Sequence, residues 1–333
     1  MALRCSFPNC VARGIPVNGP DRRGLRTSVN QVPEPGPFSE LPRIAYIEKK
    51  EWSRLLIRAM TFNVLTTEIP EEDIENPNDV WSYRADLNVR TILRYRPDVM
   101  GFQEFDDGHR TTYREHFGDY DCFDPGTRCG EGSGLAIYWR KAKFRPRDAG
   151  TFWLCHDPDV PTADWGLEYP LAATWVTLES VETGAPLLFL DTHYEDGPGG
   201  ERMRREGTRI LLDRLETIGP DLPAIVVADF NCNPWSPAYR RFLGAGFVDA
   251  YRAAGHGDSA ESSTFHGFRG REYFGLEWGG ELFWRVDWML LRDGARARWQ
   301  PTSCTIARDT EPPVYASDHY PVVSEMLLLD KED

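Results

Sequence analysis

The sequence has 333 residues, of which 41% are hydrophobic and 27% are charged, so it contains enough apolar material for a sizeable core. Its formal net charge of −14 argues against broad, unassisted binding to a nucleic-acid backbone, because such binding needs a positive surface. An acidic enzyme can still act on phosphates where metal ions supply the positive charge. Seven cysteines without tight repeated spacing favour a reducing compartment, and no apolar run suits a membrane span or signal peptide. We therefore expect a cytoplasmic protein.

The first 50 residues differ in composition from the rest of the chain. They are rich in Pro, Gly and Arg without sustained periodicity, which predicts a disordered or irregular leader over residues 1–50. Cys5 and Cys10 could supply half of a zinc site, but no second Cys/His pair lies nearby. We expect one folded domain over residues 51–333, without internal repeats.

Strand-like runs and helical segments alternate through this domain. Leu55–Leu65 is an apolar run that contains Asn63, Tyr83–Arg96 has helical spacing, and Asp98–Glu104 is a second apolar run that ends in an acid. The other predicted elements are strands at Gly134–Trp139 and Thr151–Leu154, a hairpin of Ala172–Leu178 with Leu187–Thr192, helices at Glu201–Ile218 and Ser236–Leu243, a loop region at Asp249–Gly280, and strands at Arg285–Leu291 and Tyr320–Leu329. The hairpin implies antiparallel pairs, so we expect packed sheets with helices outside.

The stretch Ala224–Pro234 contains a short apolar run bounded by prolines, as expected for a strand buried on both faces. Because strand side chains alternate, Asp229 and Asn231 are predicted to point to one side and Phe230 to the other. A carboxylate and an amide would then emerge together at a strand end, where α/β proteins often bind ligands. The same residues also fit a strand that runs into an Asx turn.

Polar residues follow several of the predicted strands, and together they suggest a chemistry. Acidic and amide oxygens suit a hard cation such as Mg²⁺, and histidine suits proton transfer when a carboxylate fixes its tautomer. The residues that could converge at strand ends are Asn63, Glu104, His193, Asp229, Asn231, Asp287, Asp318 and His319.

Six motifs in order resemble the endonuclease/exonuclease/phosphatase superfamily, which includes pancreatic deoxyribonuclease, abasic-site endonucleases, sphingomyelinases and inositol-phosphate phosphatases. They are TFNVL at Thr61–Leu65, PDVMGFQE at Pro97–Glu104, DTHY at Asp191–Tyr194, ADFNCNP at Ala228–Pro234, RVDWML at Arg285–Leu290 and SDHYPV at Ser317–Val322. The stretches Gly150–Leu154 and Ser263–Phe268 look more narrowly like a bacterial branch of the superfamily. The resemblance implies a catalytic domain over 51–333, built as a four-layer α/β sandwich with two central mixed sheets flanked by helices.

The resemblance also implies metal ligands. Glu104 would be the main ligand of Mg²⁺ or Mn²⁺, with Asn63 and Asp318 close to the same metal. The histidine motif departs from the usual pattern because it begins with Asp191 and continues with Tyr194. We expect the extra acid to lie near the metal and to affect its affinity or the range of substrates.

Catalytic roles follow from the resemblance in the same way. His319 would lie next to the scissile phosphate, oriented by Asp287, and either His319 or Asp229 would take the proton from the attacking water. Asn231 would hold the phosphate or the nucleophile, and His193 would donate to a phosphate oxygen. The aromatic residues near these motifs fit ordinary packing, and a minority interpretation has Phe265, His266 and Trp284 lining the substrate pocket.

The expected function is metal-dependent hydrolysis of a small phosphorylated molecule, which the acidic composition favours. A nuclease with the same mechanism is the alternative and would need a basic groove; the arginines at positions 202, 204, 205 and 209 more plausibly form a solvated helix face. A non-haem iron oxygenase using His193, Glu195 and a distant histidine leaves Glu104 and Asp229 without a role. A non-catalytic binding module is the remaining alternative, and the oligomeric state stays open.

Overall fold

The computed structural model describes residues 54–69, 74, 78, 80–126, 134–273, 276–278, 281–283 and 285–331. The expected leader, Cys5, Cys10 and Trp284 lie outside these residues. Within the described part of the chain, no helix is both long enough and apolar enough to cross a membrane.

The first of two six-stranded mixed sheets has the strand order β13-β16-β1-β2-β4-β3. Its strands are β1 (Arg54–Asn63), β2 (Val99–Phe105), β3 (Tyr120–Phe123), β4 (Gly134–Arg140), β13 (Ala297–Ile306) and β16 (Val322–Asp330). Strands β1 and β2 are parallel, and Asn63 pairs with Gln103 in their register. The side chains of Asn63 and Glu104 therefore lie at the same edge of this sheet.

The second six-stranded sheet has the order β5-β6-β7-β8-β12-β9. Its strands are β5 (Phe144–Trp153), β6 (Ala172–Ser180), β7 (Pro186–His193), β8 (Ala224–Asp229), β9 (Val248–Asp249) and β12 (Asp287–Arg292). Parallel β7 and β8 place His193 beside Asp229, and antiparallel β12 places Asp287 on the other side of Asp229. One register thus aligns three polar residues across three strands.

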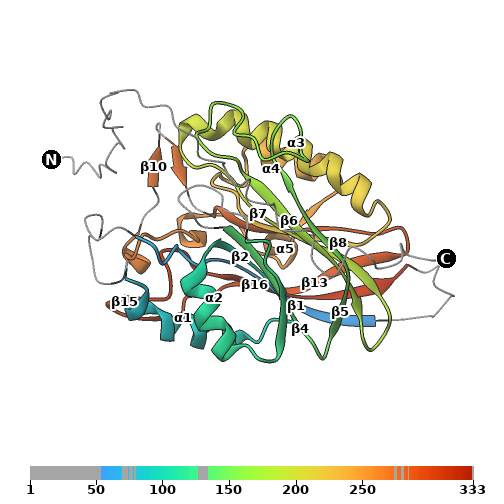
Figure 1. Ribbon diagram of the computed structural model, residues 1–333, viewed down its shortest axis with the longest axis horizontal. Coiled ribbons are helices and arrows are strands. Elements are labelled where there is room, and N and C mark those ends of the chain that lie inside the picture. The colour runs from blue at the N-terminus through green and yellow to red at the C-terminus, as the bar shows by residue number, and fades with distance from the viewer. Residues whose placement is uncertain are drawn as a thin grey trace, which may run out of the picture. The chain divides into compact units, whose positions relative to one another are not determined.

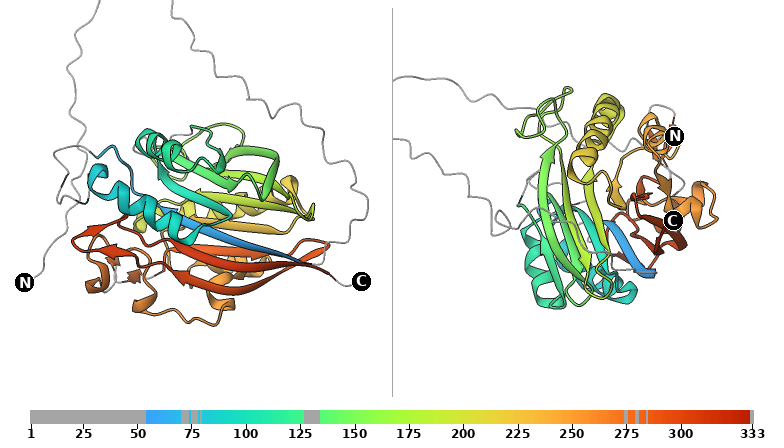
Figure 2. Two further views of the ribbon diagram at one scale, coloured as in Figure 1. Left: turned by 90° about the horizontal axis from the view of Figure 1, so that it is seen from below. Right: turned by 90° about the vertical axis from the view of Figure 1, so that its right-hand side faces the viewer.

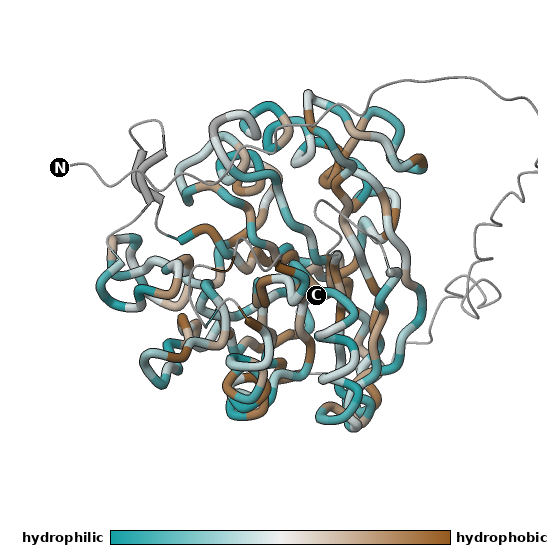
Figure 3. The backbone as a smooth tube through the Cα atoms, turned by 60° about the vertical axis from the view of Figure 1, so that its left-hand side comes forward, coloured by the Kyte–Doolittle hydropathy of each residue, from teal (hydrophilic) through white to brown (hydrophobic). Residues whose placement is uncertain are grey.

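Helices cover the outer faces of both sheets, as Figures 1 and 2 show. The helices on these faces are α1 (Trp81–Tyr95), α2 (Asp107–His116), α3 (Glu201–Ile218) and α4 (Pro237–Gly244). The short α5 (Ala250–Ala253) packs against the cluster between the sheets. One hydrophobic cluster fills the space between the sheets, a second joins α3 and α4 to the β7–β8–β12 sheet, and a third joins α1 and α2 to β1, β2 and β4. Hydrophilic residues concentrate on the outer turns of the backbone (Figure 3). The order of layers is helix, sheet, sheet, helix.

The predicted four-layer architecture with two central mixed sheets is confirmed. The helix predicted at Glu201–Ile218 has those same bounds, and its apolar stripe of Met203, Ile210, Leu211 and Leu215 is buried. Strand β13, Ala297–Ile306, was not predicted, because its exposed and buried residues alternate irregularly around Pro301 and a register shift. Two short two-stranded sheets complete the fold: β10 (Leu276–Trp278) with β11 (Glu281–Phe283), and β14 (Thr310–Glu311) with β15 (Val314–Tyr315).

Candidate active site

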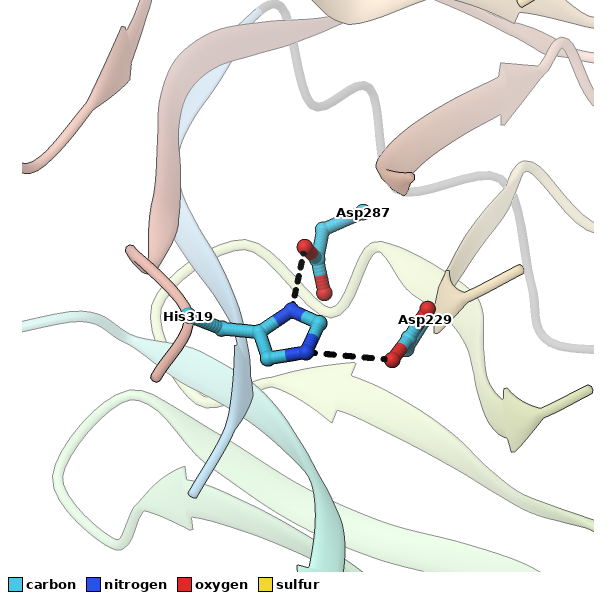
Figure 4. Close-up of side chains that lie close together, drawn as sticks. All are labelled: Asp229, Asp287 and His319. Carbon is cyan, nitrogen blue, oxygen red and sulfur yellow. Dashed lines mark hydrogen bonds and ion pairs between the residues drawn. The ribbon is translucent and has the colours of Figure 1, made fainter. Parts of the chain in front are cut away.

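The site centres on a buried histidine held between two carboxylates. Nδ1 of His319 lies 2.9 Å from Oδ2 of Asp287, and its Nε2 lies 3.6 Å from Oδ2 of Asp229, as Figure 4 shows. Asp229 and Asp287 are adjacent residues on neighbouring strands, so the sheet register fixes the distance between them. His319 comes from the segment before β16 and forms an isolated β-bridge with Phe265. The predicted pairing of Asp287 with His319 is therefore present in the structure.

Asp229 also faces a second histidine. Nε2 of His193 lies 3.4 Å from Oδ2 of Asp229 and 3.1 Å from the amide nitrogen of Asn231. The His193 side chain is 24% exposed, whereas that of Asp229 is only 1% exposed. A substrate that arrives from solvent can therefore contact His193, while Asp229 forms the floor of the site.

Asn231 reaches the site through a turn, not through strand alternation as predicted. Strand β8 ends at Asp229, and Asn231 has φ of +47°, a left-handed conformation that Asn tolerates better than most residues. The backbone N–H of Asn231 donates to Oδ1 of Asp229 at 2.9 Å, which makes an Asx turn. The alternative interpretation, a strand that runs into an Asx turn, is therefore the correct one, and this turn brings Asn231 to the site.

Glu104 and Asn63 meet where the ends of β1 and β2 lie side by side. The amide nitrogen of Asn63 donates to Oε1 of Glu104 at 2.8 Å and to Oδ2 of Asp229 at 3.0 Å, so it connects the two sheets. The Asn63 oxygen accepts the backbone N–H of Leu65. Glu104 has φ of +57°, which is unusual for a residue with a side chain and is typical of strain retained at functional sites.

Charge–charge contacts shift the pKa values of His319, Asp229 and His193. Burial opposes the charge of His319, but the carboxylates of Asp287, Asp229 and Asp318 raise its pKa well above the usual range. Burial alone would raise the pKa of Asp229, yet the charge of His319 and the contacts with His193 hold it below its ordinary value. Likewise, burial disfavours charged His193, but its contacts with Asp229 raise its pKa to about 9. At neutral pH both imidazoles are therefore protonated and Asp229 is ionised.

The residues at the expected metal position fit a hard divalent cation. Burial raises the pKa of Asp318 to about 6, and the charge of Glu104 contributes to that rise. Carboxylate and amide oxygens are the ligands that Mg²⁺ and Mn²⁺ prefer. Among the described residues, Asp229, Asp287 and His319 also offer ligand atoms within 4.8 Å of one another. His319 and Asp287 already bind each other, however. The expected oxygen ligands, Glu104, Asn63 and Asp318, therefore suit a cation better.

A second layer of buried residues supports Glu104, and the motif analysis missed it. The Arg84 guanidinium donates to the backbone carbonyls of Val64, Leu65 and Thr66, and the N–H of Thr66 donates to Oε2 of Glu104. Asp106 accepts hydrogen bonds from the same loop and caps α2. Asp106 directly follows β2, but Arg84 lies on α1 and not at a strand end, so an analysis of strand ends could not find it. The available signal for Arg84 was its place among the buried residues of α1.

Asp191 lies away from the metal residues, contrary to the expectation that it would be an extra acid beside the metal. It is fully buried between the two sheets, where its Oδ1 accepts a hydrogen bond of 2.6 Å from the Gln103 amide. Its Oδ2 has no hydrogen-bond partner among the described residues. Burial raises the pKa of Asp191 well above its usual value and so favours the neutral acid.

Two of the three expected substrate-lining residues are described, and their positions differ. The half-buried Phe265 ring lies with its centroid 5.0 Å from that of His319. His266 is 1% exposed and its ring stacks 3.9 Å from Tyr320, so it supports the wall and does not line an open pocket as predicted. Burial lowers the pKa of His266 to about 3, which keeps it neutral.

The expected solvated arginine face of α3 is only partly correct. Arg204 is 8% exposed and donates to the backbone carbonyl of Glu195. Arg205 and Arg209 are exposed but pair with acids of the same helix. The Glu195 carboxylate accepts from the Tyr169 hydroxyl, so the structure gives it a structural partner and does not assemble the iron triad.

The fold, with its two packed mixed sheets and a polar site at the strand ends, is of the deoxyribonuclease-like type. The model of the Endonuclease/Exonuclease/phosphatase family matches residues 60–319, and the chain belongs to that family. The match includes every described candidate residue of the site.

Several named relatives share parts of the chain. Nocturnin from Xenopus laevis is 30% identical over 208 residues, which are 56% of this chain and 50% of that protein. A probable RNA exonuclease from Saccharomyces cerevisiae is 22% identical over 68% of this chain and 44% of its own length. The chain thus spans about half the length of the curated relatives that it matches.

Solved structures of bacterial family members share the fold. A family protein from Bacteroides vulgatus is 26% identical with a TM-score of 0.68, over 82% of this chain and 98% of that one. A mannosyl-6-phosphatase from Bacteroides thetaiotaomicron is 23% identical with a TM-score of 0.69, over 81% of this chain and 99% of that one. The expected bacterial likeness is therefore present at the level of the fold.

Proposed function

We propose that this protein hydrolyses a phosphoester of a small molecule with the help of Mg²⁺ or Mn²⁺. The observation that carries the proposal is the chain of contacts from Glu104 through Asn63 to Asp229 and on to His319 and Asp287. These contacts connect oxygen atoms that suit a cation to a histidine with a fixed orientation. Phosphoester hydrolysis needs both features, because charge on the phosphate must be neutralised while water attacks in line.

Glu104 and Asp318 would hold the cation, with Asn63 beside them. A bound cation would supply positive charge to the phosphate oxygens. The side-chain amide of Asn63 donates hydrogen bonds to both Glu104 and Asp229. Asn63 therefore connects the proposed cation site to the residue that would activate water.

The proton-transfer roles follow from the charges. Asp229 is ionised and is proposed to take the proton from the attacking water. The side-chain amide of Asn231, which lies 3.1 Å from Nε2 of His193, would orient that water. His319 and His193 are protonated and would donate to the phosphate oxygens. The water oxygen forms a bond to phosphorus while the bond between phosphorus and the departing oxygen breaks. The departing oxygen takes a proton from one of the protonated histidines, so the products are phosphate and an alcohol.

Hydrolysis of nucleic acid by the same residues is the second candidate, and the yeast RNA exonuclease relative favours it. The described residues of α3 give it little support, because Arg205 and Arg209 pair with acids of that helix and Arg204 turns inward. The acidic chain would need another basic surface to hold a strand.

Side-by-side assays separate the two candidates. Purified protein would be incubated with a phosphomonoester, a phosphodiester, plasmid DNA and a single-stranded RNA, each with Mg²⁺, Mn²⁺ or a chelator. Metal-dependent turnover of a small ester without nucleic-acid cleavage is the expected result. Cleavage of DNA or RNA that is lost in His319→Ala would instead support the nuclease. No turnover of any of them would contradict the proposed hydrolase.

A further inference from the structure

Helix α1 contacts both of the loops that carry the expected metal ligands. Its residues Arg84 and Asn88 are four positions apart, so their side chains lie on the same face of the helix. That face is turned into the protein, because both residues are completely buried. The Arg84 guanidinium donates to three carbonyls of the loop after β1, and Thr66 of that loop donates to Glu104. Arg84 therefore supports the loop beside Glu104.

Asn88 makes the corresponding contact with the loop before β16. Its side-chain nitrogen donates to the backbone carbonyl of Ala316 at 3.2 Å, in a completely buried hydrogen bond. Ala316 lies two residues before Asp318, and Ser317 stands between them. The Ser317 hydroxyl lies 2.8 Å from the Asn63 carbonyl oxygen and 3.1 Å from Oδ1 of Asp318. A displacement of Ala316 would therefore move Asp318 relative to Asn63.

A residue of α2 fixes the orientation of the Asn88 amide. The Tyr113 hydroxyl donates to the Asn88 side-chain oxygen at 2.6 Å, and Tyr113 is completely buried. Because a backbone carbonyl oxygen can only accept, the amide nitrogen must face Ala316 and the amide oxygen must face Tyr113. The amide thus joins α1 and α2 to the loop that carries Asp318.

The surroundings of this amide are otherwise apolar. Val89 and Ile92 of the same helix belong to one hydrophobic cluster with Ala316. Burial of an amide in such a cluster costs free energy unless its nitrogen and oxygen are both hydrogen-bonded. A leucine would bury as much surface without that cost, but it could not hold a carbonyl in place. The specific gain from Asn88 is therefore the directed contact with the Ala316 carbonyl.

We propose that Asn88 is a positioning residue of the metal site, which holds the loop of Asp318 at the distance from Glu104 that a divalent cation requires. The inference rests on the proposed function, because it presupposes that Glu104 and Asp318 hold the cation. The charge of Glu104 acts on Asp318, and two like charges repel each other when no cation lies between them. Contacts behind the ligands oppose this repulsion, and the loss of such contacts typically weakens metal binding about 10- to 100-fold.

Direct binding of Mn²⁺ tests this role without any turnover. Full-length protein would be titrated with Mn²⁺ while electron paramagnetic resonance measures the free ion, and the binding that Glu104→Gln weakens identifies the site. Asn88→Leu keeps the size of the side chain but loses the contact with Ala316, so the Mn²⁺ dissociation constant should rise about tenfold or more. Tyr113→Phe removes only the hydroxyl that orients the amide, and a rise of about threefold is expected.

Val89→Ala is the matched control for a general loss of stability. It shortens a buried apolar side chain of the same helix, which cannot form a hydrogen bond with either loop. Thermal denaturation should show that Val89→Ala is destabilised, whereas its Mn²⁺ dissociation constant should stay within about twofold of the parent value. Tyr113→Phe keeps the test decisive if Asn88→Leu does not fold.

Two results would overturn the role of Asn88 alone: an unchanged dissociation constant in the folded Asn88→Leu and Tyr113→Phe variants, or an equal rise in Val89→Ala. A parent protein that does not bind Mn²⁺, or that binds it equally well as Glu104→Gln, would contradict the proposed metal site itself and this inference with it. Failure of the positioning role is thereby distinguished from failure of the proposed function.

Discussion

Oδ2 of Asp287 lies 2.9 Å from Nδ1 of His319, and both side chains are almost completely buried. Asp287 comes from β12 and His319 from the segment before β16, so two distant parts of the chain combine to fix one imidazole. The carboxylate holds the ring with its Nε2 toward Asp229 and stabilises its protonated form.

Removing the charge of Asp287 should impair catalysis more than folding. Asp287→Asn loses a hydrogen bond between charged groups, which is worth roughly 1.5–3 kcal/mol, so kcat/KM should fall about 10- to 150-fold. Because Asp287 contributes to the raised pKa of His319, the pH at which activity falls on the alkaline side should also move down. A pH–rate profile checks both effects. The exposed Asp213→Asn on α3 serves as the control, and an unchanged profile in Asp287→Asn would contradict the role of Asp287.

Substituting Glu104 should weaken the response to metal. Glu104→Gln keeps the size of the side chain but removes the charge that would hold a divalent cation, so the Mg²⁺ concentration for half-maximal activity should rise about 10-fold or more. The exposed Glu115→Gln at the end of α2 is a matched control. A Mg²⁺ titration checks the prediction, and the same half-maximal concentration in Glu104→Gln and the parent protein would exclude Glu104 as the main ligand.

Arg84 should contribute strongly to stability although it touches no substrate-facing residue. Its guanidinium is fully buried and donates to three backbone carbonyls of the loop that follows β1. Arg84→Met leaves these acceptors unsatisfied, so the free energy of unfolding should fall by about 3 kcal/mol. Urea denaturation measures this change, with the exposed Arg114→Met on α2 as the control. A loss below about 0.5 kcal/mol would show that water replaces the guanidinium at no cost.

Asp191 should make stability depend on pH. Its pKa is raised in the folded protein, so its contribution to stability is complete below the unfolded value near 4 and declines as pH rises toward the folded value. Asp191→Asn cannot ionise, and its free energy of unfolding relative to the parent should therefore increase by up to about 1.4 kcal/mol per pH unit above pH 4. Urea denaturation at pH 4.5, 6 and 7.5 measures the difference, and a difference that is independent of pH would refute a buried neutral acid at this position.

Much of the fold could be predicted from the sequence because its strongest signals are local. The apolar stripe of α3 and the apolar run before Asp229 depend on residues close together in the chain. Both patterns correctly predicted their elements, α3 and β8. Strand β13 alternates on both sides of Pro301, but a register shift there interrupts its period.

The site residues were predicted individually, but their geometry depends on pairing between distant strands. The register that sets His193 and Asp287 on either side of Asp229 joins residues from β7, β8 and β12, and no local pattern encodes it. The burial of Asp191 also follows from how the two sheets face each other: the missing side chain of Gly101 leaves the space that Asp191 occupies. Such contacts between layers cannot be predicted from a local sequence motif.

The central claim is tested most directly by the metal-dependent hydrolysis of a phosphomonoester by His319→Ala, measured beside the parent protein and the exposed surface control His116→Ala. Circular dichroism would confirm that all three proteins are folded. We expect the parent and His116→Ala to show equal turnover that a chelator abolishes, and His319→Ala to lose about 100-fold or more of it. Full activity of folded His319→Ala would contradict the proposed mechanism.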